Sequence, residues 1–208
     1  LGMIYRPVDM LRLGFAFHTP TVYRLDEYYY DGIRSEFDNG DYYEWENDAF
    51  RFSYTLTTPL RAMGGVAIQL GKAGLLSADY EFVDYRMARF SRASDNYDYY
   101  NENQDIRDIY DVAHNIRLGG ELRLNSFYVR GGYAIYGSPF VQGEDNEDNS
   151  QSVYSAGLGF RQSNFSFDVS YALRSNQQMY FMYNHPEINP ADITYNRHLV
   201  TATLGFRF

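Results

Sequence analysis

The last fourteen residues, 195–208, alternate almost strictly between apolar and polar side chains. The apolar face consists of His198, Val200, Ala202, Leu204, Phe206 and Phe208, and the opposite face consists of Arg197, Leu199, Thr201, Thr203, Gly205 and Arg207. A period of two residues predicts a β-strand with one apolar face. A strand of this length that ends on an aromatic residue is typical of the closing strand of an outer-membrane β-barrel, although a soluble β-sandwich would alternate equally well.

The same alternation recurs along the chain, and the connections between alternating segments fall into two classes. Four are tight turns, at residues 7–10, 71–74, 125–126 and 162–164. Four are long loops, at residues 20–49, 87–112, 137–151 and 175–194. Tight turns and long loops alternate along the chain, which is the pattern of bacterial outer-membrane barrels. We therefore expect an all-β fold, a transmembrane antiparallel β-barrel of the outer-membrane type.

Residues 50–70 decide the number of strands. Their even positions are mostly apolar, and the phase continues unchanged through Pro59. Since a slip of one residue would exchange the two faces, this segment predicts a single long strand with an irregularity at Pro59. With a rise of about 3.3 Å per residue and a tilt of about 40°, half of it would project beyond an apolar band of ~25 Å. Pro59 would then lie near the membrane edge.

The alternation of turns and loops gives about nine strands with this assignment. Complete bacterial single-chain barrels have an even number of strands and no free edge. We therefore expect residues 1–208 to be the C-terminal part of one larger barrel domain, with the true N-terminus upstream of Leu1. No signal peptide is recognisable at the start of this sequence.

The amino-acid composition excludes some classes of binding partner and favours others. The formal net charge of −9 argues against a nucleic-acid partner, because nucleic acids bind basic surfaces. Aromatic residues make up 18% of the chain, which fits strands and membrane-interface belts. The tyrosine clusters at residues 28–30 and 97–100 fit a membrane-interface girdle or loop packing better than a sugar-binding platform. No apolar run approaches the length of a transmembrane helix, and the absence of cysteine excludes a disulfide framework.

Four stretches, in the same order along the chain, resemble the FadL-type outer-membrane transporters of long-chain fatty acids and aromatic hydrocarbons. They are LGMIYRPVDMLRLGFAFHTPT (1–21), TLTTPLRAMGGVAIQLGKAGLLSADYEFVDY (55–85), HNIRLGGELRLNSFYVRGGYAIYGSP (114–139) and the terminal GFRF. The resemblance implies a fourteen-stranded barrel with an N-terminal hatch in the lumen and a kinked strand that opens a lateral exit. By this match the chain holds the last nine strands, and the hatch and the first five strands are absent.

The resemblance also implies a function. It predicts an outer-membrane channel for passive uptake of hydrophobic or amphipathic small molecules such as fatty acids, without a cofactor. The long loops would be extracellular and the C-terminus periplasmic. An alternative is a family member that has become a surface scaffold, or partner protein, of a secretion machine. Lipid, a fatty-acid-like ligand and a surface protein are therefore the expected partners.

Charged residues of both signs occupy the polar face of the predicted strands. They are Arg61, Asp79, Glu81, Arg117, Glu121, Arg123, Arg130, Asp168, Arg174 and Arg197. They suit either ion pairs that fill the lumen or a polar passage in which an arginine meets the carboxylate of an amphiphile. If one contacts ligand, we expect it to be Arg61, Arg117, Arg130 or Arg197.

Two loop segments have unusual composition. The run from Met179 through Tyr180, Phe181 and Met182 to Tyr183 is apolar for an external loop, so it is a candidate for first capture of a hydrophobic ligand. Packing against neighbouring loops is the alternative. Residues 143–149 carry calcium-type oxygens without the spacing of an EF-hand loop, which favours a solvated acidic loop.

Nothing in the sequence supports catalysis strongly, and we expect no enzyme and no metal site. The histidines lack the spacing of a metal motif, and no nucleophile elbow is present. His18 and His114 lie near the loop ends of predicted strands, where an outer-membrane hydrolase would place its site. A hydrolase is therefore the less favoured alternative.

Overall fold

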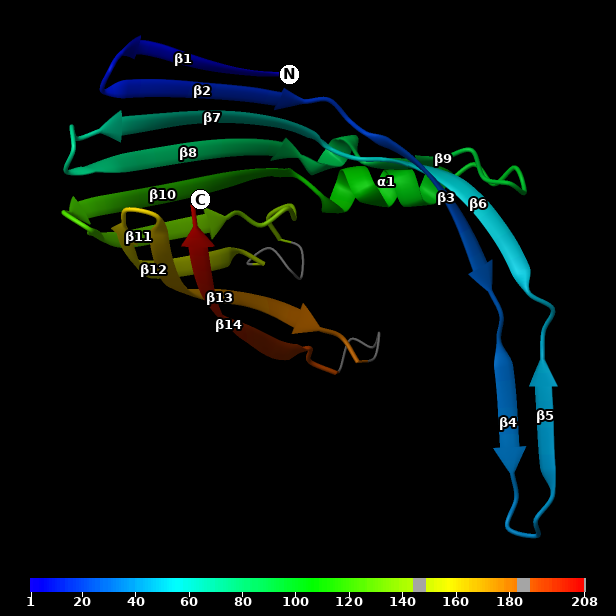
Figure 1. Ribbon diagram of the computed structural model, residues 1–208. Coiled ribbons are helices and arrows are strands. Elements are labelled where there is room, and N and C mark those ends of the chain that lie inside the picture. Colours follow the sequence, from blue (N-terminus) through cyan, green and yellow to red (C-terminus); the bar gives the residue numbers. More distant parts are fainter. Residues whose placement is uncertain (144–148, 183–187, 208) are drawn as a thin grey trace.

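The computed structural model describes residues 1–143, 149–182 and 188–207. Its main body is a nine-stranded antiparallel sheet in the order β1-β2-β7-β8-β10-β11-β12-β13-β14, curved into a trough (Figure 1). The strands are β1 (Gly2–Val8), β2 (Leu11–His18), β7 (Leu60–Gln69), β8 (Gly74–Asp84), β10 (Val112–Leu124), β11 (Phe127–Tyr136), β12 (Gln151–Gln162), β13 (Phe165–Tyr180) and β14 (Ala191–Phe206). The predicted all-β barrel fold and the count of nine strands are confirmed, although the sheet is not closed and β1 and β14 are its edges.

The four predicted tight turns join neighbouring strands at one end of the trough. Asn125 and Ser163 adopt positive φ angles of 56° and 48° in two of these turns, and Gly71 does so in a third, at 57°. Asparagine and glycine tolerate this left-handed conformation, which lets the chain reverse over very few residues. All turns therefore lie at one end of the sheet, and the longer connections lie at the other.

Two rows of aromatic side chains border the convex face. Near the turns, Phe127 packs on Phe160 with ring centroids 5.2 Å apart, and Phe165 packs on Phe206 at 5.5 Å. A second row contains Tyr80, Tyr133 and Tyr171, each six residues after the first residue of its strand. Six residues correspond to about 20 Å along a strand. Between the rows, the outward positions of β8 and of β10 to β14 carry no acidic or basic side chain, as a lipid-facing band requires.

Residues 50–70 form two strands, so the predicted single long strand is wrong. The first, β6 (Phe50–Thr57), ends before Pro59, and β7 begins directly after it. Proline has no N–H for a sheet hydrogen bond, and the chain changes its neighbours at this point. β7 pairs with β2 and β8, whereas β6 belongs to a separate sheet of order β3-β6-β9. The break was not predicted, because the alternation of apolar and polar residues does not show which strand pairs with a given segment.

Residues 20–49 are also ordered as strands, where the sequence pattern indicated only a loop. β3 (Val22–Tyr29) pairs with β6, and β4 (Gly32–Glu36) pairs with β5 (Tyr42–Glu46). The resulting ribbon leaves the loop end of the main sheet, bends and extends far from it (Figure 1). We refer to residues 31–48, which contain β4 and β5, as the hairpin arm. The arm is the part of the chain most remote from the trough.

Residues 87–112 form a small aromatic core beside the ribbon. They include part of η1 (Tyr85–Met87), β9 (Arg89–Ser91) and α1 (Tyr100–Ile109). Tyr54, Phe90 and Tyr99 pack together here, with centroids 5.7 Å apart for Tyr54 and Phe90 and 5.5 Å for Phe90 and Tyr99. The hydroxyl of Tyr54 donates to Glu27 at 2.6 Å, and this hydrogen bond raises the pKa of Tyr54. Within the described residues no helix has the length and apolar character to cross a membrane.

The last hairpin is longer than the pattern predicted. β13 and β14 stay paired as far as the Tyr180 and Ala191 pair, so much of the predicted loop at 175–194 is strand. Met179 and Tyr180 lie on β13, and Phe181 and Met182 follow it. The interval between β11 and β12 agrees with the predicted loop at 137–151. Residues 144–148 of the acidic run, Tyr183 of the apolar run and the terminal Phe208 lie outside the described residues.

Candidate functional site

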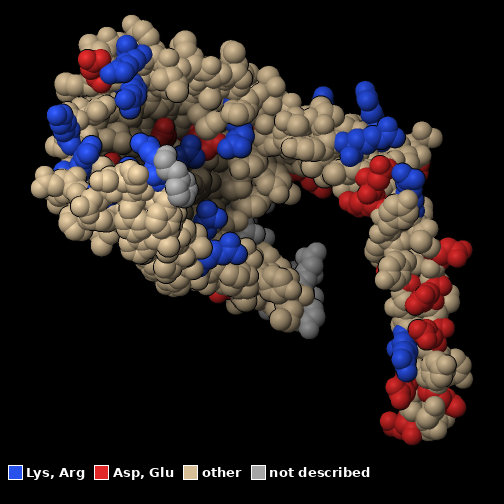
Figure 2. All heavy atoms as spheres, in the orientation of Figure 1, with Lys and Arg blue, Asp and Glu red and all other residues tan. Residues whose placement is uncertain are grey.

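The hollow of the trough carries the charged side chains, as the alternation predicted, and Figure 2 shows acidic and basic residues lying within it. Glu81 of β8 is the most enclosed of them, with 1% of its side chain exposed. It accepts hydrogen bonds from Arg61 Nε at 2.8 Å, Arg117 Nη1 at 2.9 Å and Asn115 Nδ2 at 3.3 Å. The residue opposite Glu81 is Met63 on β7 and Asn115 on β10, so each arginine reaches it diagonally. One carboxylate therefore holds two of the four predicted ligand-contacting arginines.

Arg130 of β11 forms a second charge cluster. Its Nε donates to Glu121 at 2.6 Å, and its Nη1 donates to Asp168. Gly159 lies between Arg130 and Asp168, and a Cβ at this position would stand 2.4 Å from the Asp168 carboxylate. The glycine thus makes room for the ion pair. The charge of Arg130 is balanced within the sheet, which weakens its candidacy as the residue that meets an anionic ligand.

Arg197 differs from the other three candidates. It lies directly opposite Arg174 in the pairing of β13 with β14, and both side chains are exposed on the same face. Among the residues that the structure describes, no carboxylate forms an ion pair with either. Like charges directly opposite each other on a sheet are destabilising. This pair of guanidinium groups is therefore a place in the trough where positive charge is not compensated by a described carboxylate.

A hollow of about 810 Å³ lies over β1, β2, β7 and β8. Its floor is lined by small side chains, Gly14, Ala16, Gly65 and Ala67, and its charged lining residues are Arg12, Asp79 and Arg117. A Cβ on Gly65 would come within 2.3 Å of the Asp79 carboxylate, so this glycine leaves space for the acid. The hollow combines an apolar floor with a few charged groups, a composition typical of small-molecule sites.

A second hollow of about 600 Å³ lies at the loop end of the same strands. His18, Pro59, Arg61, Glu81 and Tyr136 are among its lining residues. Arg117 lines both hollows, so the Glu81 cluster stands between them. A third hollow of about 240 Å³ is lined in part by Arg130 and Asp168. Three of the predicted arginines, Arg61, Arg117 and Arg130, thus line these hollows.

The predicted capture segment is placed at the loop end of the final hairpin. Tyr180, Phe181 and Met182 are exposed there. Met179, by contrast, pairs with Asp192 within the sheet, so the loop prediction is wrong for Met179 and Tyr180. None of the three hollows described above is lined by both this segment and one of Arg61, Arg117 and Arg130.

The histidines do not assemble a site. His114 and His198 point to the convex face, where Tyr80 and Tyr171 hydrogen-bond to their Nδ1 atoms at 2.5 and 2.7 Å. His18 lines the second hollow, on the opposite side of the sheet from His114. Within the described ranges, no group of three acidic, histidine or cysteine side chains could hold a metal ion. The two histidines considered for a hydrolase therefore face different environments.

Several residues that line the first hollow were not predicted from the sequence. Arg12 and the small floor residues Gly14 and Ala16 stand on the polar face of β2, in the alternating pattern already visible in the sequence. A run of glycine and alanine on a polar barrel face is the signal that could have located the hollow. The partners of each arginine could not be predicted in this way, because they depend on the register between strands.

Comparison with solved structures supports the fold. No protein-family model and no curated sequence matches the chain. A crystal structure of a Pseudomonas aeruginosa FadL homologue aligns with 98% of the chain, with a TM-score of 0.59 and 14% sequence identity. The aligned region is 49% of that protein, so the chain spans about half its length. At this identity the likeness establishes the fold: the chain folds like part of a FadL-type β-barrel.

Proposed function

We propose that this chain is part of an outer-membrane channel that admits hydrophobic or amphipathic small molecules of the fatty-acid type by passive diffusion. The observation that carries the proposal is the hollow of about 810 Å³ on the concave face, with its apolar floor and its charged residues Arg12, Asp79 and Arg117. Such a surface accepts an apolar chain along the floor and a polar head at the rim. The FadL-like fold supports the same function.

The arginines of the trough divide into two roles in this proposal. Arg61, Arg117 and Arg130 are held by Glu81, Glu121 and Asp168, so they act mainly as charged walls of the passage. Arg197 together with Arg174 lacks an ion pair with any carboxylate among the described residues, and it offers an anionic head group a second contact, on β13 and β14, separate from the hollow over β1, β2, β7 and β8. Guanidinium groups bind carboxylates with two parallel hydrogen bonds, which adds affinity and orientation.

The proposed orientation follows from the two ends of the trough. The aromatic rows bracket about 20 Å of uncharged convex surface, which fits the apolar band of an outer membrane. Outer-membrane barrels have short periplasmic turns and longer extracellular loops. In this orientation the hairpin arm and the exposed run Tyr180, Phe181 and Met182 are extracellular, and the C-terminus is periplasmic. The exposed run is then placed to capture ligand from outside.

The test is uptake of a radiolabelled long-chain fatty acid by cells that lack their own transporter and produce the full-length protein. We expect uptake above that of empty cells, and roughly tenfold lower uptake at subsaturating ligand in the R174A/R197A variant, because a hydrogen bond to a charged group contributes about 1.5–3 kcal/mol. The R34A variant, which removes an arginine of the arm, is the matched control and should take up ligand normally. Uptake equal to that of empty cells would overturn the proposal.

The alternative role, a surface scaffold, is favoured by one observation, the uncovered hairpin arm. The channel and the scaffold would use different surfaces, the concave face of the trough and the arm. Neither role excludes the other.

A further inference from the structure

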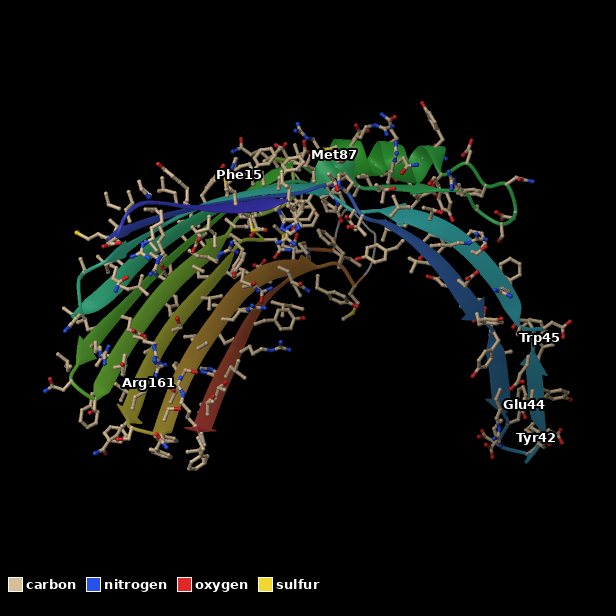
Figure 3. The ribbon with its side chains drawn as sticks, turned by 45° about the horizontal axis from the view of Figure 1, so that its top comes forward. Phe15, Tyr42, Glu44, Trp45, Met87 and Arg161 are labelled. Carbon is tan, nitrogen blue, oxygen red and sulfur yellow. The ribbon has the colours of Figure 1, made fainter. Side chains whose placement is uncertain are left out.

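The hairpin arm is an amphipathic ribbon with an uncovered apolar face. Its register pairs Ile33 with Trp45 and Ser35 with Tyr43, which places these residues on one face. Phe37 extends this face through an edge contact with Tyr43 at 5.9 Å. The side chains of Trp45 and Tyr43 are 60% and 68% exposed, and every residue of β4 and β5 is exposed. Figure 3 shows Trp45 and Tyr42 standing on the arm, away from the main sheet.

The other face and both ends of the arm are strongly acidic. Residues 31–48 contain seven carboxylates and one arginine, so these eighteen residues hold a net charge of −6 out of −9 for the whole chain. The acidic residues are Asp31, Glu36, Asp38, Asp41, Glu44, Glu46 and Asp48. The single cation, Arg34, lies over the ring of Tyr42 at 5.4 Å. No described residue forms an ion pair with any of the seven carboxylates.

Nothing in the described part of the chain covers this ribbon. β4 and β5 pair only with each other, and their outer edges carry free backbone N–H and C=O groups. A two-stranded hairpin in water is marginally stable at best, and exposed apolar patches bordered by polar residues mark interaction sites. The arm therefore has the composition of a surface that is completed by binding.

Charge selects among the partners that could cover it. A second copy of the arm would bring two segments of net charge −6 together, which is unfavourable. An anionic lipid surface is repelled for the same reason. A protein that presents a cationic cleft would neutralise the carboxylates while its apolar floor covers the Trp45 face, and complementary charge also accelerates association.

We propose that the hairpin arm is a docking element for a partner protein with a cationic, apolar-floored cleft that closes around β4 and β5. Trp45 and Tyr43 are the anchors on the apolar face. Glu36, Glu44 and Glu46 are the acidic contacts on the opposite face, which Arg34 and Tyr42 share with them. This proposal does not depend on the channel function, because it uses none of the residues of the trough.

The test replaces Trp45 with the photo-crosslinking amino acid p-benzoylphenylalanine in the full-length protein, in the cells that produce it. We expect one crosslinked protein whose mapped contact peptides are net basic. The yield should fall at least tenfold in the E44Q/E46Q background and by a similar factor in 0.5 M salt, because both weaken charge pairing. The matched control is D105N/D108N, which removes two carboxylates from exposed positions on α1 and should leave the yield unchanged.

Other outcomes overturn the proposal. They are crosslinks only to lipid, to polysaccharide or to a second copy of this chain, and a protein crosslink that is indifferent to both E44Q/E46Q and salt. Circular dichroism of the E44Q/E46Q variant checks that its sheet is intact, so that a lost crosslink reports lost contact. Fatty-acid uptake measured in the same cells separates a failure of docking from a failure of the channel.

Discussion

Glu81 and Glu44 are both glutamates on antiparallel strands, and their surroundings are opposite. Glu81 lies in the trough, enclosed by two arginines and an asparagine. Glu44 lies on the hairpin arm, exposed and without an ion-pair partner among the described residues (Figure 3). The carboxylate of Glu81 in the trough is neutralised within the sheet, whereas the arm presents its carboxylates outward. The difference indicates that Glu81 serves the packing of the sheet, whereas Glu44 is accessible from solvent.

The largest expected difference between the two regions is in stability. Replacing Glu81 with Gln leaves Arg61 and Arg117 in the trough without their carboxylate. Removing one partner of a buried ion pair costs 3–5 kcal/mol, and water around the partly exposed arginines recovers some of this, so we expect a loss of about 3 kcal/mol. Urea unfolding of the full-length protein in micelles measures it. E44Q is the control and should change stability by less than about 0.5 kcal/mol. Equal effects of the two substitutions would remove the distinction between the regions.

Substitutions of two adjacent glycines test whether the space beside Asp79 is needed for ligand uptake. In G65A the new Cβ meets the Asp79 carboxylate, whereas in G64A nothing lies within 4 Å of it. We expect G65A to cost about 1 kcal/mol and to lower fatty-acid uptake, because the acid must move into the hollow. Unfolding and uptake should be measured together for both variants. Equal uptake by G65A and G64A would contradict this expectation.

Arg174 and Arg197 lie directly opposite each other within the trough, and removing one of them should stabilise the protein. Replacing Arg197 with Ala relieves repulsion between directly opposed charges, which we expect to add roughly 0.5 kcal/mol in ligand-free protein. The gain should shrink as salt rises, since salt screens exposed charges. Chemical unfolding at low and high ionic strength measures both effects. A loss of stability at both salt concentrations would show that Arg197 is internally paired.

The smallest effect is expected on the arm. Trp45 is the only tryptophan of the chain and is exposed. Replacing it with Ala should change the stability of the main sheet by less than about 0.5 kcal/mol, because it buries little surface there. Urea unfolding followed by circular dichroism measures this. A larger loss would mean that the arm packs against the sheet.

The sequence predicted the trough far better than the ribbon. The turns at 125–126 and 162–164 and the faces of β8 and β10 to β14 follow from an alternation that a lipid-facing band enforces. Residues 22–46 lack that constraint, because both of their faces are exposed to water. Acidic and aromatic residues therefore occur without regular alternation, and the three strands β3, β4 and β5 were not predicted. The break at Pro59 was missed because the alternation continues across a change of partner.

The sequence predicted on which face of the sheet the candidate residues lie, but not which residues they contact. Arg61, Arg117, Arg130 and Arg197 all stand on the concave side, as their positions in the alternation require. Their partners depend on strand register: Arg61 and Arg117 converge on Glu81 from different strands, and Arg197 meets Arg174. No pattern within one strand carries that information. Glycine and alanine on a polar face indicate the floor of the hollow, because small side chains leave space there. The positions of charged residues alone do not show this space.

Density inside the barrel of the full-length protein tests most directly whether the concave face conducts amphipathic molecules. The protein would be purified from its native membrane without added lipid and its structure determined experimentally. We predict elongated apolar density along the floor formed by Gly14, Ala16, Gly65 and Ala67, with a head group beside an arginine of the trough. A lumen filled by water alone or packed with side chains would contradict it.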